Sequence, residues 1–348
     1  MNQGGTDMRH LVLILVTILA TLTASFSALA ATEYALAMAG DNITYANPVW
    51  SPDGRSIAYV AIQSVPTEPP SKETSIRLAT LVGGKWQHRV LVQNADRPVW
   101  SPDGKRIAVW TKGGPALVDV ATSKTFPLYK SVAYYPMAWS ADGRWLLLMP
   151  GADSEGQPVV RDMKTGNVLT VSKAHTALWT WDGKLVTAVP EVEGGSEPSI
   201  LRITDPKTGT FRTVLKGRYI DSLFSPKGAG YVWGRMRKDA PKGEGIYRVD
   251  LKSGAILKMI SVRAEELTFS PDGKQFAFLG KWAEKSDMVP EINVYLGNTQ
   301  NWYFKVVSKG AMTPSDTLAD KRRYISWSPD SKSIAYITKV GDIRIVKL

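Results

Sequence analysis

The chain contains no cysteine and only three histidines among its 348 residues. Without thiols it can form neither a disulfide framework nor a thiolate metal site, and it has no cysteine nucleophile. His10 lies within residues 1–30, which are expected to be removed as a signal peptide. Two histidines remain, too few for the histidine clusters of many metallohydrolases. We therefore expect no metal, no cofactor and no catalytic residues.

Long hydrophobic runs are also lacking, with one exception near the N-terminus. Arg9 precedes an apolar run from Leu11 to Leu22, and small residues lead to an Ala28-x-Ala30 pattern. This arrangement is typical of a cleaved secretory signal peptide. The alternative, an uncleaved membrane anchor, requires about 20 apolar residues. We predict a signal peptide over residues 1–30, cut after Ala30, and one exported domain over residues 31–348, which suits a periplasmic location.

Negative charge is in short supply, because 32 acidic residues face 43 basic ones and the net charge is +11. Removal of residues 1–30 leaves this balance unchanged, since the segment holds one Arg and one Asp. A basic surface favours anionic partners such as acidic proteins or envelope glycolipids. We expect an envelope protein as partner, no nucleic acid outside the cytoplasm, peripheral membrane contact at most, and a monomer.

One short motif recurs along the chain: an aromatic residue followed by Ser-Pro-Asp-Gly or a close variant. Pro presets φ for a turn, Asp and Ser bond back to the backbone, and Gly accepts a left-handed conformation, so each copy predicts a hairpin bend. The seven copies recur at intervals near the 40–45 residues of a propeller blade. They begin at Trp50, Trp100, Trp139, Trp179, Phe224, Phe269 and Trp327.

The segments between the motifs supply the remaining strands of each blade. A strand that is apolar on both faces follows each turn, as in a blade packed between two neighbours, and third and fourth strands follow, for example at 199–205 and 210–215. The seventh copy stops after three strands, and residues 32–40 belong to no complete blade. We predict an all-β, seven-bladed β-propeller of four-stranded blades in which this N-terminal strand closes the last blade.

The tandem WSPDG repeats resemble those of TolB-type periplasmic proteins and of the propeller domains of prolyl-oligopeptidase-type peptidases, over nearly all of residues 32–348. The resemblance implies the propeller fold. TolB-type proteins carry an α/β domain before a six-bladed propeller, whereas only about ten residues of the mature chain precede the first strands here. The repeats are accompanied by neither a hydrolase domain nor a Gly-x-Ser-x-Gly elbow, which argues against a peptidase.

A first candidate site lies where the inner strands start, three to five residues before the motif aromatics. Polar and aromatic side chains there should converge on the propeller axis and either pair with one another or form a funnel for a small polar ligand or the tip of a partner peptide. A hydrolase or lyase acting on sugars or peptides in this funnel is the alternative function. The candidates are Tyr45, Arg97, Tyr135, His175, Asp221, Glu266 and Arg323.

A second candidate site lies on the face opposite the motif turns, where the loops between second and third strands hold irregular sequence at 63–75, 151–158, 190–199, 234–245 and 280–291. These loops are acidic in blades 3 and 4 and basic in blade 5. They are either solvated charge or a charge-complementary docking surface for a protein. The candidates are Glu191, Glu193, Arg235, Arg237 and Lys238.

Together these features predict a TolB-like binding or assembly platform in the cell envelope rather than an enzyme. His88, on an outer strand, is expected to be an ordinary surface residue. The motif aspartates are expected to serve the turns rather than to bind calcium, because no D-x-[DN]-x-[DN]-G loop occurs.

Overall fold

The computed structural model describes residues 32–69, 71–129, 133–151, 156–171, 174, 176–190, 198–216, 220–226, 228–236, 240, 242–262, 264, 266–280, 292–312 and 323–348. The expected signal peptide lies outside these ranges. Within them there is no helix that is long and apolar enough to cross a membrane.

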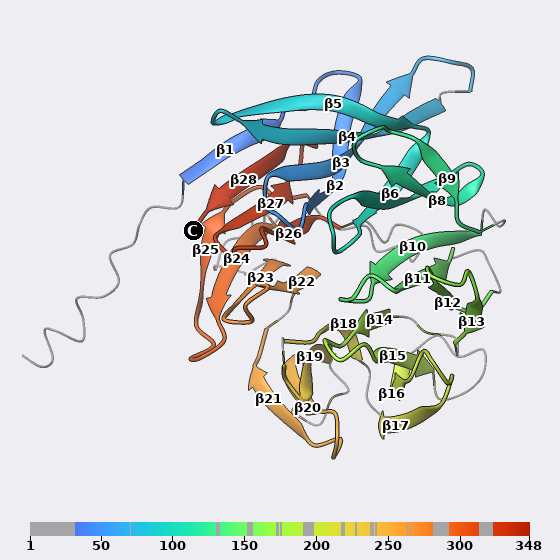
Figure 1. Cartoon of the computed structure of the whole chain (residues 1–348). Coiled ribbons are helices and arrows are strands. Elements are labelled where there is room, and N and C mark those ends of the chain that lie inside the picture. The colour runs from blue at the N-terminus through green and yellow to red at the C-terminus, as the bar shows by residue number, and fades with distance from the viewer. Residues whose placement is uncertain are drawn as a thin grey trace, which may run out of the picture.

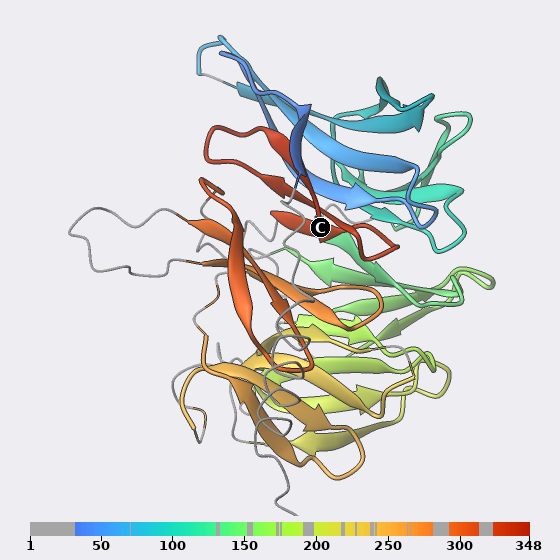
Figure 2. The same ribbon diagram turned by 90° about the vertical axis from the view of Figure 1, so that its left-hand side faces the viewer.

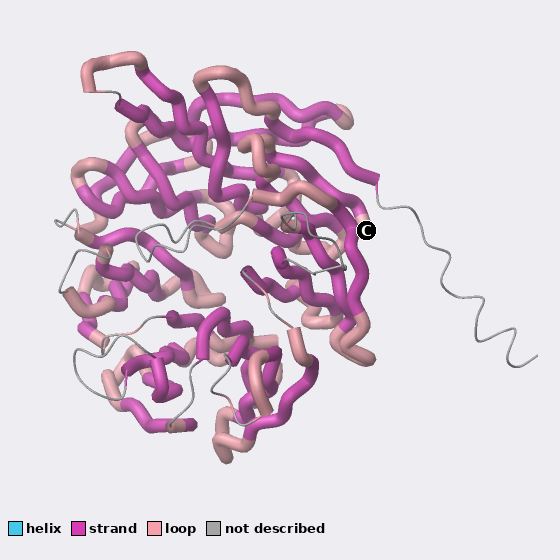
Figure 3. Tube along the Cα trace, turned by 180° about the vertical axis from the view of Figure 1, so that it is seen from behind, coloured by secondary structure: helices cyan, strands magenta, loops and turns pink. Residues whose placement is uncertain are grey.

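The described residues form seven four-stranded antiparallel sheets arranged in a ring, with the first strand of each blade innermost (Figure 1). In the described part of the chain, strands are the only regular elements, as the view from behind shows (Figure 3). The prediction of an all-β, seven-bladed propeller is confirmed. Blades 1 to 3 consist of β2 (Ile43–Trp50), β3 (Ser56–Val65), β4 (Ser71–Val82) and β5 (Lys85–Gln93); β6 (Ala95–Trp100), β7 (Arg106–Thr111), β8 (Gly114–Asp119) and β9 (Thr125–Pro127); and β10 (Tyr134–Trp139), β11 (Trp145–Pro150), β12 (Val159–Asp162) and β13 (Val168–Thr170).

The other four blades repeat the same order of strands. Blades 4 to 7 consist of β14 (Thr176–Trp179), β15 (Leu185–Pro190), β16 (Pro198–Thr204) and β17 (Phe211–Leu215); β18 (Ile220–Phe224), β19 (Tyr231–Met236), β20 (Gly245–Asp250) and β21 (Ile256–Ile260); β22 (Glu266–Phe269), β23 (Gln275–Gly280), β24 (Asn293–Asn298) and β25 (Phe304–Ser308); and β26 (Ile325–Trp327), β27 (Ser333–Ile337), β28 (Ile343–Lys347) and β1 (Thr32–Ala37).

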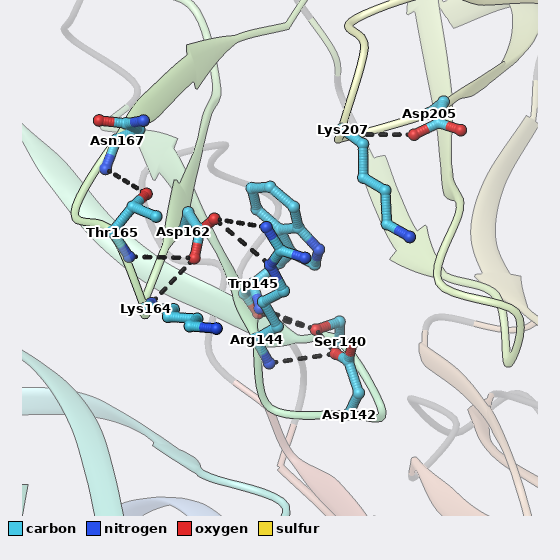
Figure 4. Close-up of polar contacts among 10 residues, drawn as sticks. All are labelled: Ser140, Asp142, Arg144, Trp145, Asp162, Lys164, Thr165, Asn167, Asp205 and Lys207. Atoms are coloured by element: carbon cyan, nitrogen blue, oxygen red, sulfur yellow. Dashed lines mark hydrogen bonds and ion pairs between the residues drawn. The ribbon is translucent and has the colours of Figure 1, made fainter.

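The motif turns of blades 1, 2, 3, 6 and 7 share one hydrogen-bond pattern, seen for blade 3 in Figure 4. Ser140 Oγ donates to Asp142 Oδ1 over 2.6 Å, the Arg144 amide donates to the same oxygen, and the Trp145 amide donates to Ser140 Oγ. The Arg144 guanidinium also reaches Asp162, at the end of β12, over 2.9 Å. The motif aspartate therefore has the turn role expected of it, because its carboxylate caps the bend.

Proline and glycine of successive motifs pack against each other around the ring. A Cβ on Gly54 would lie 3.3 Å from Pro329, which belongs to the preceding blade. Gly104 and Gly143 face the preceding prolines in the same way, whereas Gly183, which follows a motif with alanine in place of proline, meets nothing within 4 Å among the described residues. The repeated wording of the motif thus serves contacts between blades as well as the bend itself.

The motif tryptophans join neighbouring blades through their indole nitrogens. Trp100 Nε1 donates to the Val49 carbonyl over 3.1 Å, and Trp139 and Trp179 make the equivalent bond to blades 2 and 3. Trp50 Nε1 and Trp327 Nε1 are buried and find no partner among the described residues. The joint between blades 7 and 1, where the chain closes on itself, therefore lacks the indole bond of the three joints that follow it.

The ring closes through β1, which pairs antiparallel with β28 from Thr32 opposite Lys347 to Ala37 opposite Ile343. The carboxylate of Glu33 fastens this strand. It accepts hydrogen bonds from Ser308 of blade 6 over 2.6 Å, and from Arg344 and Tyr336 of blade 7 over 2.8 and 3.1 Å. The prediction that the N-terminal strand closes blade 7 is confirmed.

One expected loop is instead regular structure. Residues 63–75 do not form an irregular connection, because β3 runs to Val65 and β4 begins at Ser71, so the two strands form a long hairpin. His88 is exposed on β5, as expected, and its Nδ1 lies 2.8 Å from the Tyr59 hydroxyl. Burial and the nearby Arg77 lower the pKa of this imidazole.

Candidate functional site

The inner strands of blades 1 and 2 are interrupted at matching positions, three residues before the motif tryptophan. Asn47 has φ 50° and Arg97 has φ 57°, both in the left-handed region that residues other than glycine adopt infrequently. The strand register shifts at both places, between Ala46 and Val49 and between Asp96 and Val99. Such bulges redirect a side chain, and strained backbone of this kind gathers at functional sites.

Asp96 fixes the geometry of this part of the ring. It is buried, with 9% of its surface exposed, and its Oδ1 accepts hydrogen bonds from Asn47 Nδ2 over 2.9 Å and from the Arg97 amide over 2.6 Å. Because Nδ2 of Asn47 faces Asp96, its Oδ1 faces blade 7 and accepts a hydrogen bond from the backbone amide of Arg323 over 2.6 Å. Three blades are thus joined by one chain of hydrogen bonds.

Arg97 lies against an aromatic ring of the next blade. Its guanidinium carbon is 4.1 Å from the ring centroid of Tyr135, in cation–π geometry. Burial raises the pKa of the Tyr135 hydroxyl, and the neighbouring Arg97 charge opposes that rise only in part. Tyr135 therefore stays neutral at physiological pH and serves as a fixed surface for the guanidinium.

Arg323 extends from the start of blade 7 toward the opposite side of this cluster. Its Nη2 lies 3.5 Å from the Met137 carbonyl of blade 3. Arg323 is partly exposed to solvent, but neighbouring protein atoms desolvate its guanidinium. We call the hollow that it borders the axial site, of about 80 Å³, large enough for a carboxylate-sized group. Its lining consists of Asn47, Val49, Arg97, Pro98, Val99, Tyr135, Pro136, Met137 and Arg323.

Glu266, the first residue of β22, holds the segment that carries Arg323. Its Oε2 accepts a hydrogen bond from the Tyr324 amide over 3.0 Å. Burial raises the pKa of Glu266 to about 7, against the opposing effects of the Tyr324 amide and the Arg323 charge. Burial also lowers the pKa of Arg323, whose guanidinium nevertheless remains protonated. The site thus pairs a permanent cation with a carboxyl group that titrates near neutrality.

Of the axial candidates, Arg97, Tyr135 and Arg323 line this site, and Glu266 lies beside it, bound to the Tyr324 amide. Tyr45 does not: only 8% of it is exposed, and it packs edge-on against Tyr59, 5.5 Å between centroids, in the core between blades 7 and 1. The expectation that Tyr45 faces the channel is wrong because the bulge that follows it places Asn47 there instead. His175 lies outside the described residues, and Asp221 is described only as part of the β18 backbone.

Sequence reasoning missed Asn47, Asp96 and Met137. The signal for Asn47 is its residue type, since Asn is enriched at positive φ. The signal for Asp96 is its place directly before an arginine at a predicted strand start. No sequence pattern indicates Met137, which contributes through its carbonyl oxygen.

On the loop face, Glu191, Glu193, Arg237 and Lys238 lie outside the described residues. Arg235 is described, and its expected place in an exposed loop is wrong. It belongs to β19, opposite Ile246, and only 9% of its surface is exposed. Strand β19 continues through Met236, so the loop of blade 5 begins later than the sequence indicates. Among the described residues there is no group of three or more acidic, His or Cys side chains that could hold a metal ion.

Comparisons with known proteins identify the architecture. No family model and no curated protein matches the sequence. The structure is similar to oligogalacturonate lyase from Vibrio parahaemolyticus, with TM-score 0.69 and 12% identity, covering 92% of this chain and 97% of that one. It is also similar to the β-propeller domain of the Trilobed protease from Pyrococcus furiosus, with TM-score 0.60 and 17% identity over 85% and 91% of the two chains.

A third similar structure is a putative TolB from Agrobacterium tumefaciens, with TM-score 0.46 and 16% identity over 75% of this chain and 93% of that one. A peptidase propeller is therefore among the structural neighbours. At these identities the likeness shows the propeller fold alone.

Proposed function

We propose that this protein is a binding platform of the cell envelope that recognises an acidic segment of a partner protein at the axial site. The observation that carries the proposal is that guanidinium groups from two different blades, Arg97 of blade 2 and Arg323 of blade 7, line one small hollow. Guanidinium groups present a planar set of donors that matches a carboxylate, and charge-assisted bonds of this kind are strong.

Both arginines are held before any partner arrives. Arg97 rests on the Tyr135 ring, and the backbone of Arg323 is fixed by Asn47 and by the neighbouring bond from Tyr324 to Glu266. A preorganised site loses less conformational entropy on binding, so more of the interaction energy appears as affinity. The small volume of the hollow favours the tip of a larger partner over an enclosed ligand.

The charge of the whole chain supports the same partner class. A net charge of +11 attracts acidic proteins over a distance and raises their rate of association. The N-terminal sequence supports export, and the proposed location is the periplasm.

The second candidate function is a lyase or hydrolase that uses the same hollow. Glu266 favours it, because a carboxyl group whose pKa is about 7 suits general acid–base catalysis and Arg323 lies beside it. The similar oligogalacturonate lyase makes an acidic sugar the first substrate to test. In this case ultraviolet absorbance would report a new double bond on incubation with oligogalacturonate, and Glu266→Gln would abolish the signal.

The binding proposal is tested by fluorescence anisotropy with a labelled glutamate-rich peptide and its glutamine counterpart. We expect only the acidic peptide to bind, and Arg323→Gln to weaken binding by about 10- to 100-fold, the value of a charge-assisted hydrogen bond. Arg106→Gln is the matched control, because Arg106 is an exposed arginine at the motif-turn end of β7. Equal binding of both peptides, or equal loss in both variants, would contradict the proposal.

A photo-crosslinking probe at Met137 tests the proposal in the native envelope, with a probe at Lys105 in a motif turn as control. A discrete adduct from Met137 that is lost in the Arg323→Gln background is the expected result. An adduct that persists without the arginine charge would show that Arg323 does not recognise the partner and would contradict the proposal.

A further inference from the structure

A second hollow lies on the face of the motif turns, at the joint between blades 7 and 1. Its volume of about 550 Å³ falls within the range of small-molecule sites. We call it the closure groove. Its lining consists of Tyr34, Trp50, Asp53, Gly54, Leu81, Gly84, Trp86, Ser328, Pro329, Asp330, Ser333 and Lys347.

The groove exists because blade 1 has an unusually long outer hairpin. Strands β4 and β5 contain 12 and 9 residues, and they are joined by Gly83 and Gly84, both at positive φ as a two-residue hairpin turn requires. The hairpin lies above the closing blade at one edge of the ring (Figures 1 and 2). The opposite wall is the motif turn of blade 7.

The aromatic rings of the closing joint are arranged differently from those of the three joints that follow it. Trp50 makes no indole-to-carbonyl bond with the preceding blade, unlike Trp100 and Trp139. Instead its ring packs edge-on against Trp86 of the outer hairpin, 6.1 Å between centroids. Tyr34 of β1 lines the same hollow, so three partly exposed aromatic rings border it.

The charges on the lining are mixed in sign. Asp53 and Asp330 lie at the rim, each accepting bonds within its own motif turn, and the Lys347 ammonium lies 5.6 Å from the Tyr34 ring centroid. A cationic ligand would be repelled by Lys347, whose ammonium already lies over the Tyr34 ring. An anionic ligand would be repelled by the carboxylates of Asp53 and Asp330. The lining therefore disfavours a ligand with net charge of either sign.

What remains is a neutral ligand with apolar faces and many hydroxyl groups. Aromatic rings pack against the apolar faces, while carboxylates accept hydrogen bonds from hydroxyl groups and an ammonium donates to them. Sugars combine these two properties. We propose that the closure groove is a binding site for a neutral carbohydrate, such as a short uncharged glycan segment, bound between Trp50, Trp86 and the motif turn of blade 7. The proposal is independent of the axial site and of the function proposed for it.

The test is titration of the protein with three neutral trisaccharides, cellotriose, maltotriose and N,N′,N″-triacetylchitotriose, followed by tryptophan fluorescence and isothermal calorimetry. We expect at least one of them to bind and Trp86→Ala to weaken binding about tenfold or more. The matched control is Trp181→Ala, because Trp181 is an exposed tryptophan, 48% accessible, in the motif turn of blade 4.

Thermal unfolding of each variant shows whether the fold is kept. If Trp86→Ala does not fold, Trp86→Phe and Lys347→Gln decide the question, since the first keeps an aromatic ring and the second removes only an exposed ammonium. Retained binding in Trp86→Phe with a severalfold loss in Lys347→Gln would support the proposal. Absence of binding for all three sugars, equal loss in Trp181→Ala, or preferential binding of a triarginine peptide would overturn it.

Discussion

The Arg323 amide donates a hydrogen bond to Asn47 Oδ1 over 2.6 Å, and this contact both joins blade 7 to blade 1 and forms a wall of the axial site. The Asn47 side chain also donates a hydrogen bond to Asp96 through Nδ2. The ring and the site therefore both depend on the orientation of this one asparagine. A change there affects stability and binding together.

Replacement of Asn47 by Asp tests this dependence. Asp tolerates the positive φ, but its carboxylate would face that of Asp96 in a site where Asn47 is only 4% exposed. We expect a loss of about 2–3 kcal/mol in the free energy of unfolding at neutral pH, measured by urea denaturation, and a smaller loss in acid. Asn94→Asp is the control, since Asn94 has φ 51° and is exposed. Equal losses would show that only backbone strain matters.

The titration of Glu266 predicts the pH dependence of anion binding. Its pKa is raised to about 7, so above that pH its charge opposes the positive field of Arg323, and below it the carboxyl is neutral. Affinity for the glutamate-rich peptide should therefore rise as pH falls from 8 to 6, and Glu266→Gln should flatten the profile. The same slope in both proteins would contradict the assignment.

Glu33 predicts how the closure responds to acid. Burial alone would raise the pKa of this carboxyl, but hydrogen bonds from Ser308, Arg344 and Tyr336 outweigh burial and hold the pKa below its usual 4.5. A depressed folded-state pKa contributes stability that is present above the unfolded-state pKa and lost as pH falls through the folded-state value.

Glu33→Gln should accordingly reduce the free energy of unfolding by about 1–3 kcal/mol at pH 7 and by less below pH 4. Urea denaturation at the two pH values measures the effect. Glu73→Gln, an exposed glutamate on β4, is the control and should change little. A loss that does not shrink in acid would rule out the carboxylate as the fastener.

The indole bonds predict a difference between two chemically identical substitutions. Trp139→Phe removes a donor from the Val99 carbonyl, whereas Trp50→Phe removes an indole nitrogen that has no partner among the described residues. We expect Trp139→Phe to be the more destabilising by about 1 kcal/mol, measured as the difference in urea unfolding. Equal effects would mean that ring volume, and not the hydrogen bond, determines the outcome.

The propeller itself is predictable from the sequence because one local pattern repeats seven times and each copy has the same neighbours. Even the contact of Pro329 with Gly54 follows from the repeat. The axial site is less predictable, since topology brings the inner strands together but does not say which side chains face the axis. Asn47 adopts a positive φ at a strand irregularity that the repeat does not specify, so the sequence does not indicate that Asn47, and not Tyr45, lines the site.

The closure groove depends on features that the repeat does not contain. One wall is the outer hairpin of blade 1, where β4 and β5 extend to a turn at Gly83 and Gly84, and no motif specifies this length. Its other wall comes from the final motif, where Ser331 stands in place of glycine at φ 62°. The repeat therefore does not predict the groove, because the groove is built from residues that differ from the repeat.

The pairing of β1 with β28 joins residues about 310 positions apart, the longest sequence separation in the fold. Among the described strands, Thr32–Ala37 comes first in the chain and its partner, Ile343–Lys347, comes last. The other six blades pair neighbouring strands of the chain, whereas blade 7 must bring its N-terminal and C-terminal strands together. Completing the ring therefore closes the longest loop in the described fold, and loss of β1 would leave β28 with an unpaired sheet edge open to aggregation.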